Sequence, residues 1–317
     1  PTPHTVLATT GLHAQWRLTE AMMSCRRLDG EYRFADEGNC AWARASTWTS
    51  TQESTGRATG YHESSDEVST GVQHSLGGGG TWYGGIAVAY ERPQLDDGAA
   101  WHSNGSLTQL GAVFKGRLGP FTAALSGTYG TGRYDTRRPV PFLGDDAVAR
   151  SRQDLTLTSA DLRLAYDFQH AAWYLRPLLD VDFTHVQVDR FAEQGAGPAN
   201  LIVEKQSHDT TALRPAVEIG TELRLERGNA LRPFARVGAT QVVAGRTSSI
   251  AALFTEAPDG VAPFVVENRV DDSYADVLVG LDLVRTHGLS ARFTYGGQMS
   301  SHTSSYAVGL KLTVPLH

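Results

Sequence analysis

The chain has 317 residues, a formal net charge of −6 and a pI near 6.0, which excludes a basic surface for nucleic acid. No apolar run is long enough to cross a bilayer as a helix, so the sequence predicts no transmembrane helix. The mean hydropathy of −0.27 is typical of soluble proteins, but strands that are apolar on one face only also give such an average.

The N-terminal region has a helical pattern. It opens Pro1-Thr2-Pro3-His4, which lacks the basic start and apolar segment of a signal peptide. We therefore interpret the chain as a mature form or as the C-terminal part of a longer precursor. Across residues 5–29, apolar side chains recur at helical spacing and predict an amphipathic helix. Its polar side carries the charges that we assign to a pore helix: Arg17, Glu20, Arg26 and Arg27.

The two cysteines, Cys25 and Cys40, lie 15 positions apart around the predicted end of this helix. In an oxidising compartment outside the cytoplasm they are candidates for a disulfide. Closing a loop of that size stabilises a fold by roughly 3 kcal/mol in the chain-entropy model. The alternative is a pair of free, buried thiols.

The remainder of the chain alternates between apolar and polar residues over about twelve long segments, which predicts β-strands. Residues 217–226 show the pattern most clearly, with apolar residues on one face and both signs of charge on the other. The predicted strands are 41–50, 67–76, 81–92, 104–118, 121–133, 154–168, 172–189, 201–226, 230–246, 270–285, 289–299 and 304–316.

Ionised residues of both signs share one face of nearly every predicted strand, which fits a closed barrel with an apolar exterior in lipid and a wet interior. We expect the following charged residues to line that interior and to hold the helix: Lys115, Arg117, Asp161, Arg163, Arg176, Asp180, Asp182, Glu218, Glu222, Arg224, Arg232, Arg236 and Arg292. The alternative is that they are solvated channel walls with offsetting charges.

Short and long connections alternate between the strands. The long ones are 51–66, 93–103, 134–153, 190–200 and 247–269. Tight turns on the periplasmic rim and long loops outside are typical of outer-membrane barrels. The predicted fold class is therefore all-β: a transmembrane antiparallel β-barrel of about twelve strands with an N-terminal α-helix in the lumen. Its organisation is a pore helix and linker over 1–38 and an outer-membrane barrel over 39–317.

Three segments strengthen this interpretation by resemblance: 175–179 with 189–196, 231–238, and the opening Trp42-Ala43-Arg44 after an amphipathic helix. Their order and spacing resemble the C-terminal translocator domain of autotransporters, the type V secretion proteins. The resemblance implies a monomeric 12-stranded barrel in the bacterial outer membrane, assembled by the barrel-assembly machinery. It also implies export of the chain's own N-terminal passenger domain, which is absent here. The family's last strand usually ends on an aromatic residue, whereas this chain ends Leu316-His317.

Two other functions are alternatives. A stand-alone porin for small solutes would explain the barrel but leaves the helix without a role. A lipid hydrolase would need a nucleophile near a base such as His185, and the spacing compels no such pair. The sequence shows no metal motif and no phosphate-binding loop. We therefore predict that the chain is not an enzyme and binds no metal or cofactor, with outer-membrane lipid and its passenger as partners.

Overall fold

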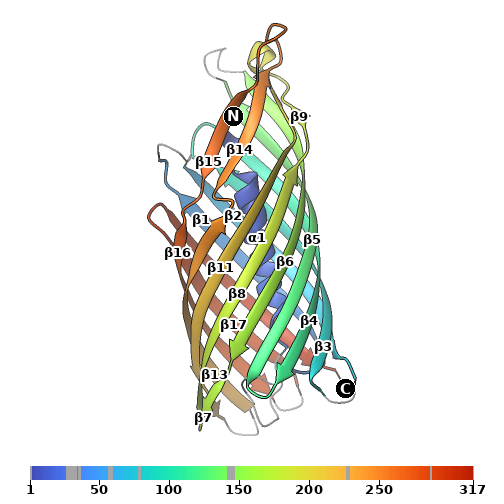
Figure 1. Cartoon of the computed structure of the whole chain (residues 1–317), viewed down its shortest axis with the longest axis vertical. Helices are drawn as coiled ribbons and strands as arrows, with labels where there is room; N and C mark the ends of the chain where they lie inside the picture. The colour runs from blue at the N-terminus through green and yellow to red at the C-terminus, as the bar shows by residue number, and fades with distance from the viewer. Residues whose placement is uncertain are drawn as a thin grey trace.

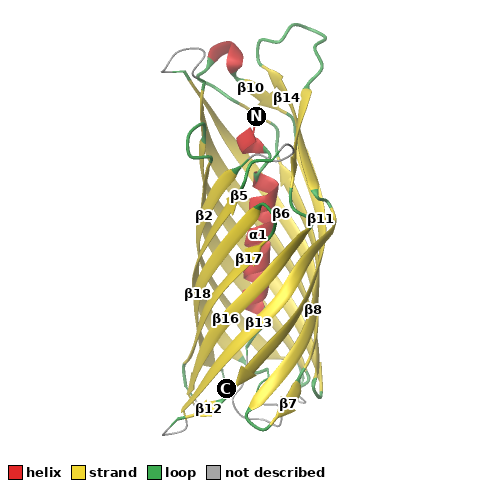
Figure 2. Cartoon of the chain, turned by 90° about the vertical axis from the view of Figure 1, so that its left-hand side faces the viewer, coloured by secondary structure: helices red, strands yellow, loops and turns green. Residues whose placement is uncertain are grey.

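The computed structural model describes residues 2–25, 34, 37–55, 60–77, 80–140, 147–225, 229–285 and 288–316. Within these ranges, twelve long antiparallel strands close into a barrel around one α-helix (Figures 1 and 2). Each long strand pairs with the next in the chain, and the last pairs with the first, from Cys40 opposite Pro315 to Gln52 opposite Thr303. The predicted fold class is confirmed.

The barrel strands follow the predicted segments closely. They are β1 (Cys40–Gln52), β2 (Tyr61–Ser75), β3 (Trp82–Asp96), β4 (His102–Leu118), β5 (Phe121–Pro139), β6 (Val148–Tyr166), β8 (Trp173–Val188), β11 (Gln206–Thr221), β13 (Asn229–Ala244), β16 (Ser273–Arg285), β17 (Ser290–Met299) and β18 (Thr303–Pro315). Two short strands lie at the lower rim, β7 (Phe168–His170) and β12 (Leu223–Arg224). The predicted strand 201–226 was too long, because residues 201–203 belong to a different sheet and the barrel strand is interrupted between β11 and β12.

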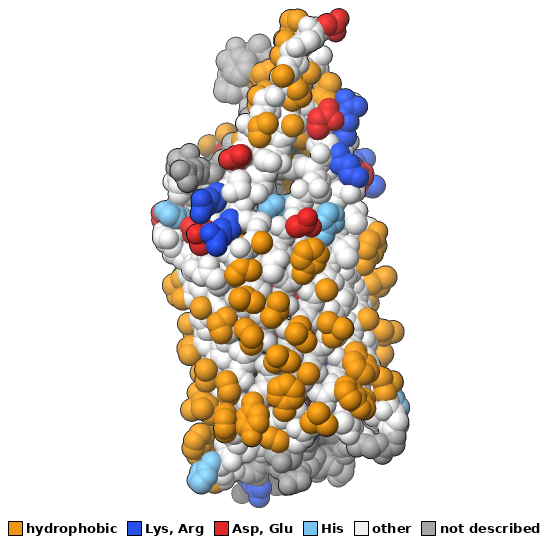
Figure 3. Space-filling view, in the orientation of Figure 1, with side chains coloured by type: hydrophobic (Ala, Val, Ile, Leu, Met, Phe, Trp, Pro, Cys, Tyr) orange, Lys and Arg blue, Asp and Glu red, His pale blue; other side chains and the backbone are white. Residues whose placement is uncertain are grey.

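Alternate residues of each strand point outward and form an apolar belt around the barrel (Figure 3). In β4, Leu110 and Phe114 are 60% and 47% exposed, whereas Gln109 and Lys115 are buried. Trp82 and Phe114 stack on the outer face with their ring centroids 5.2 Å apart, as expected in an aromatic girdle. The belt is apolar because it contacts the acyl chains of the membrane rather than water.

The two rims differ, as the alternation of connections predicted. Short turns and the C-terminus lie at the lower rim in Figure 1, and the long connections lie at the upper rim. The segments 190–200 and 247–269 were predicted as loops, and this was wrong in part. They contribute to a small sheet above the barrel, formed by β9 (Phe191–Ala192), β10 (Leu201–Val203), β14 (Thr247–Phe254) and β15 (Phe264–Arg269) with the 3-10 turn η3 (Gly197–Ala199) nearby.

The helix α1 (Leu7–Met22) lies inside the barrel, preceded by the 3-10 turn η1 (Thr2–His4) near the upper mouth (Figure 2). It is shorter than the predicted helix 5–29, since residues 23–25 are not helical and residues 26–29 lie outside the described part. Apolar clusters surround both of its halves, one near Leu7 and one near Leu18. Among the described residues, no helix combines the length and the apolar composition needed to cross a membrane.

Candidate functional site

The lumen helix is buried on all sides. Every side chain of α1 except that of Glu20 is buried, although the helix carries His13, Gln15 and Arg17. A helix with such a sequence is normally wet on its polar side, so the barrel wall must supply partners for its charges. Close approach is possible at Gly11, where an added Cβ would come within 3.2 Å of Val186.

Glu20 joins the helix to two strands on one side of the lumen. Its carboxylate accepts from Arg163 Nη2 at 2.6 Å and from Arg236 Nη1 at 3.0 Å. Arg163 also makes a two-point contact with Asp180, at 2.6 and 2.7 Å, and Arg236 donates to Glu218 at 2.8 Å. The alternating signs compensate these buried charges, and bidentate arginine contacts fix the geometry.

Arg17 and His13, one helical turn apart, face an acidic part of the wall on β2 and β3. Arg17 Nη2 donates to Glu91, and its Nε lies 3.7 Å from Glu67 Oε2. His13 Nδ1 lies 3.5 Å from Glu63 Oε2. None of these three acidic residues is among the lumen charges predicted from the sequence. Glu67 and Glu91 lie on the inward faces of the predicted strands 67–76 and 81–92, whereas Glu63 precedes the predicted start of its strand.

The C-terminal end of the helix is held by cations from the barrel seam. Lys311 Nζ on β18 donates to the main-chain oxygens of Ala21 and Ser24 at 2.7 and 2.6 Å. Arg44 Nη1 on β1 donates to the oxygen of Arg17 at 3.0 Å. The last carbonyls of a helix lack partners within it and carry the negative end of its dipole. The wall therefore selects the direction of α1 as well as its position.

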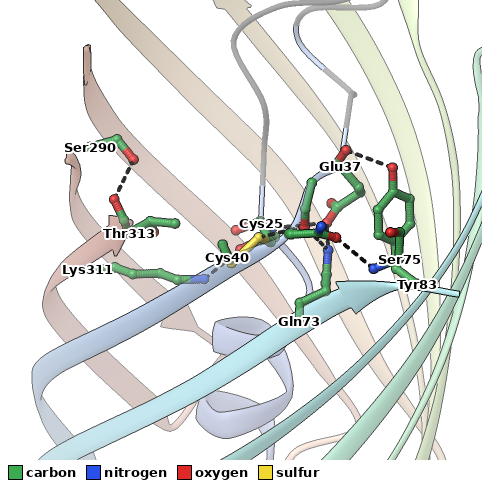
Figure 4. Close-up of a disulfide and its surroundings, with 12 residues drawn as sticks. Cys25, Glu37, Cys40, Gln73, Ser75, Tyr83, Ser290, Lys311 and Thr313 are labelled. Carbon is green, nitrogen blue, oxygen red and sulfur yellow. Dashed lines mark hydrogen bonds between the residues drawn. A yellow bond between two sulfur atoms is a disulfide. The ribbon is translucent and has the colours of Figure 1, made fainter. Parts of the chain in front are cut away.

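A disulfide ties the segment after the helix to the first residue of β1. Cys25 and Cys40 are bonded, with an S–S distance of 2.01 Å and Cα atoms 6.1 Å apart (Figure 4). Glu37 lies beside the bond and accepts from Lys115 Nζ at 3.0 Å and from Gln73 Nε2 at 2.8 Å. The predicted disulfide is confirmed, and the predicted lumen residue Lys115 contacts the linker rather than the helix.

At the upper mouth, His4 holds the N-terminal segment to the small sheet. Its Nε2 donates to Glu193 at 3.1 Å, and its Nδ1 accepts from the Gln153 amide at 2.9 Å. Accepting at Nδ1 requires a neutral imidazole. Burial lowers the pKa of His4 and outweighs the opposing effect of the Glu193 carboxylate. Burial raises the pKa of Glu193, but hydrogen bonds from His4 and Arg138 outweigh it and bring that pKa to about 2.

The structure places most of the predicted lumen charges on the inner face. Beyond the contacts above, Arg176 binds Glu218 at 2.9 Å, Arg232 binds Glu222 at 2.7 Å and Arg292 binds Asp282 at 2.5 Å. The remaining predicted carboxylates lie on β6 and β8, where Asp161 accepts from Thr19 at 3.1 Å and Asp182 lies 3.8 Å from Arg214.

For four other predicted residues the outcome is different. Arg117 lies at the lower rim, where its Nε donates to the oxygen of Gly119 at 3.1 Å. Arg224 was expected in the lumen, but it lies on the short strand β12 at the lower rim, where its side chain is 78% exposed. Arg26 and Arg27 lie outside the described residues.

A cavity of about 160 Å³ remains beside the helix, on the side of β11, β13, β16 and β17. Its lining includes Trp16, Glu20, Arg214, Asp276 and Gln298. The helix thus packs against the wall on the side of β3 and β4 and leaves a gap on the other side.

The outer face offers little for catalysis. His185 lies there, and its Nδ1 contacts Asp209 Oδ1 at 2.7 Å. Thr158 is opposite His185 in the strand register, but in the described part of the chain no hydroxyl hydrogen-bonds to its imidazole. Within the described ranges, no group of three or more potential ligands is arranged to hold a metal ion.

A closed twelve-stranded barrel with an apolar belt and a charge-matched helix through its lumen defines an outer-membrane translocator. The chain matches the family described as "Autotransporter beta-domain" over residues 41–296 and belongs to that family. It is 27% identical over 293 residues to "Extracellular serine protease" of Serratia marcescens, covering 91% of this chain and 27% of that protein. The chain thus spans about a quarter of the length of the curated relatives it matches.

Solved structures show the same fold. The translocator domain of autotransporter NalP from Neisseria meningitidis superposes with a TM-score of 0.76 at 15% identity, covering 97% of this chain and 98% of that one. The beta domain of the Bordetella autotransporter BrkA gives 0.63 at 16% identity, covering 88% and 100%. The protein is an autotransporter translocator domain that resides in the bacterial outer membrane and serves a passenger domain.

Proposed function

We propose that the lumen is the path by which a passenger attached upstream of Pro1 reaches the cell surface, and that α1 then plugs it. Residues 1–38 would form the plug and its linker, and residues 39–317 the barrel. The direction of α1 carries this proposal. Its C-terminal end lies toward the short-turn rim, and η1 lies at the long-loop mouth, so a polypeptide preceding Thr2 would emerge outside (Figure 2).

We assign the lumen charges to holding this plug. The strongest support is Glu20, whose two arginine partners come from β6 and β13, separated by β8 and β11 in the barrel. A solvated channel wall would not need to place both partners around one helix residue. A porin would need an open lumen, whereas fifteen of the sixteen residues of α1 are buried inside the barrel.

We infer that the barrel itself performs no catalysis. Its curated relatives include proteins named "Extracellular serine protease" and "Esterase EstA", which suggests that a common barrel serves passengers with different activities. The passenger of this chain would set the activity of the whole protein. The contact between His185 and Asp209 is then an ordinary hydrogen bond on the outer face.

We further propose that the protein is a monomer assembled by the cell's barrel-assembly machinery. The pairing of β1 with β18 closes the sheet and leaves no barrel edge for a second copy. In β18, Tyr306, Val308 and Leu312 keep the outward apolar alternation that an insertion machinery would meet first.

The proposal is tested by fusing a signal peptide and an epitope-tagged passenger directly before Pro1. Antibody binding to intact cells should detect the tag at the surface, and external protease should remove it. A tag inserted between Ala171 and Ala172, in a short turn, is the matched control and should stay inaccessible until the outer membrane is permeabilised. A passenger tag that becomes accessible only after permeabilisation would refute the export route.

A further inference from the structure

The outer face of the barrel carries a hollow lined by arginines just below the small sheet. It lies on β4, β5 and β6, with the segment 190–195 along one side, and encloses about 1020 Å³. We call it the outer arginine groove and define it by the residues Arg137, Arg150, Arg152 and Arg190 together with His102 and Asn104. None of the contacts described above between α1 and the barrel wall involves these residues, because their side chains point away from the lumen.

The pairing of β5 with β6 contains a charge conflict within this groove. Arg133 faces Asp154 and Asp135 faces Arg152, and each pair forms an ion pair of 3.0 Å. The next outward position breaks this pattern.

There, Arg137 lies directly opposite Arg150, and both side chains are exposed. Like charges directly opposite each other destabilise a strand pair. Among the described residues, no carboxylate forms an ion pair with either guanidinium, whereas Arg190 is paired with Glu204 at 3.4 Å. Two like charges face to face on a short stretch of otherwise matched pairs favour the binding of an anion between them.

The height of the groove identifies that partner. Tyr129 on β5 is 52% exposed and belongs to the apolar belt. Arg133 and Arg137 lie four and eight residues further along the strand. A strand rises about 3.3 Å per residue and is tilted by about 40°, so these residues stand about 10 and about 20 Å above Tyr129. On the face shown in Figure 3, Lys and Arg side chains likewise lie outside the apolar belt.

We propose that the outer arginine groove binds the phosphorylated sugar headgroup of the outer-leaflet glycolipid, lipopolysaccharide. Arginine forks match phosphate oxygens in two-point contacts, and Arg137 and Arg150 would share one phosphate that relieves their repulsion. His102 and Asn104 supply hydrogen-bonding groups suited to sugar hydroxyls. The barrel would thus carry a bound lipid on the strands that support the small sheet at its mouth.

Binding is tested with the purified barrel in detergent. The probes are deep-rough lipopolysaccharide, the same lipid after enzymatic removal of its phosphates, and inorganic phosphate. We expect Arg137→Ala/Arg150→Ala to weaken binding of the intact lipid about tenfold or more. The dephosphorylated lipid should bind the wild type with similarly weakened affinity. The matched control, Arg92→Ala/Arg224→Ala, removes two exposed arginines outside the groove and should bind like the wild type.

A stability measurement in the absence of lipid gives a second readout. Removing the facing arginines relieves repulsion, so the double variant should melt at the same temperature as the wild type or higher, and added lipid should stabilise it less. Equal lipid affinity in wild type and double variant would overturn the proposal. Inorganic phosphate binding as tightly as the lipid would also overturn it, because the groove would then be a general anion site.

Discussion

The ammonium of Lys311 donates to the main-chain oxygen of Ala21 at 2.7 Å, so the last strand of the barrel holds the end of its first helix. The two residues stand 290 positions apart. This contact cannot form until β18 has joined the sheet, and β18 also pairs with β1 to close the barrel. Seating of α1 and closure of the barrel are therefore coupled.

Replacing Lys311 with methionine should loosen the helix. The variant removes charged hydrogen bonds to two helix-end oxygens, each worth roughly 1.5–3 kcal/mol. In planar bilayers we expect more frequent and longer channel openings than in the wild type. Lys205→Met, which changes an exposed lysine above the barrel, should behave like the wild type. A Lys311→Met channel as quiet as the wild type would show that the seam does not hold the plug.

Glu20→Gln should open the pore through a different contact. The neutral amide removes the charge that Arg163 and Arg236 share on the helix, while both arginines keep their partners on the wall. We expect the open probability to rise about tenfold, which corresponds to about 1.4 kcal/mol. Glu204→Gln at the upper rim is the control. If both variants gate alike, Glu20 has no special part in retention.

Deleting residues 1–30 should leave a permanently conducting barrel. The helix occupies the lumen, so its removal exposes a hydrated path lined by charges of both signs. Cys40→Ser is included to avoid a free thiol. Single-channel conductance should exceed that of the full chain, and unchanged conductance would contradict the assignment of α1 as the plug.

Cys25→Ser/Cys40→Ser should destabilise the helix–barrel unit by roughly 3 kcal/mol in the chain-entropy model. The free energy of unfolding in urea, measured under oxidising conditions, checks this value. Reducing agent should lower the stability of the wild type and leave the double variant unchanged. Equal stability of both proteins under oxidising conditions would mean that the bond contributes little.

Acidification should release the N-terminal segment at the upper mouth. The pKa of His4 is lower in the folded protein than the ordinary value of about 6.5, so the folded mouth binds fewer protons than the released segment. Its stabilisation is complete above that value and falls as the pH drops below it.

Hydrogen exchange of residues 5–12, corrected for the intrinsic rate, should therefore be faster at pH 5.5 than at pH 7.5. His4→Gln removes the titrating group and should show no such difference. A wild type whose corrected exchange is equal at both pH values would rule out His4 as the sensor.

The barrel could be predicted from the sequence because the same physical requirement produces alternation of apolar and polar residues in every barrel strand. A strand with lipid on one side and water on the other must alternate, as Leu110 and Lys115 do on β4. Two strands of the small sheet, β9 and β10, have only two and three residues, which are too few to establish a period. The strand pairing of the small sheet joins segments that are distant in the chain.

The charged character of the lumen was predictable from the sequence, but the individual ion pairs were not. Sequence placed Arg163 and Glu20 in the lumen, but only the register of the barrel brings Arg236 to the same carboxylate. Lys311 was overlooked, because its partners are main-chain oxygens that leave no mark in the sequence. Arg224 was misplaced, because β12 lies at the rim of the barrel, where this side chain is exposed.

The bond between Cys25 and Cys40 has a consequence for the bacterium itself. Cys40 is the first residue of β1, the strand that pairs with β18 to close the barrel. The segment after the plug is therefore covalently bonded to the barrel wall. Cutting the polypeptide ahead of Thr2 at the surface would leave this fastening intact. Barrels that have lost their passenger would then remain closed as they accumulate in the outer membrane. Tolerance to bile salts or large antibiotics would not depend on the number of these barrels.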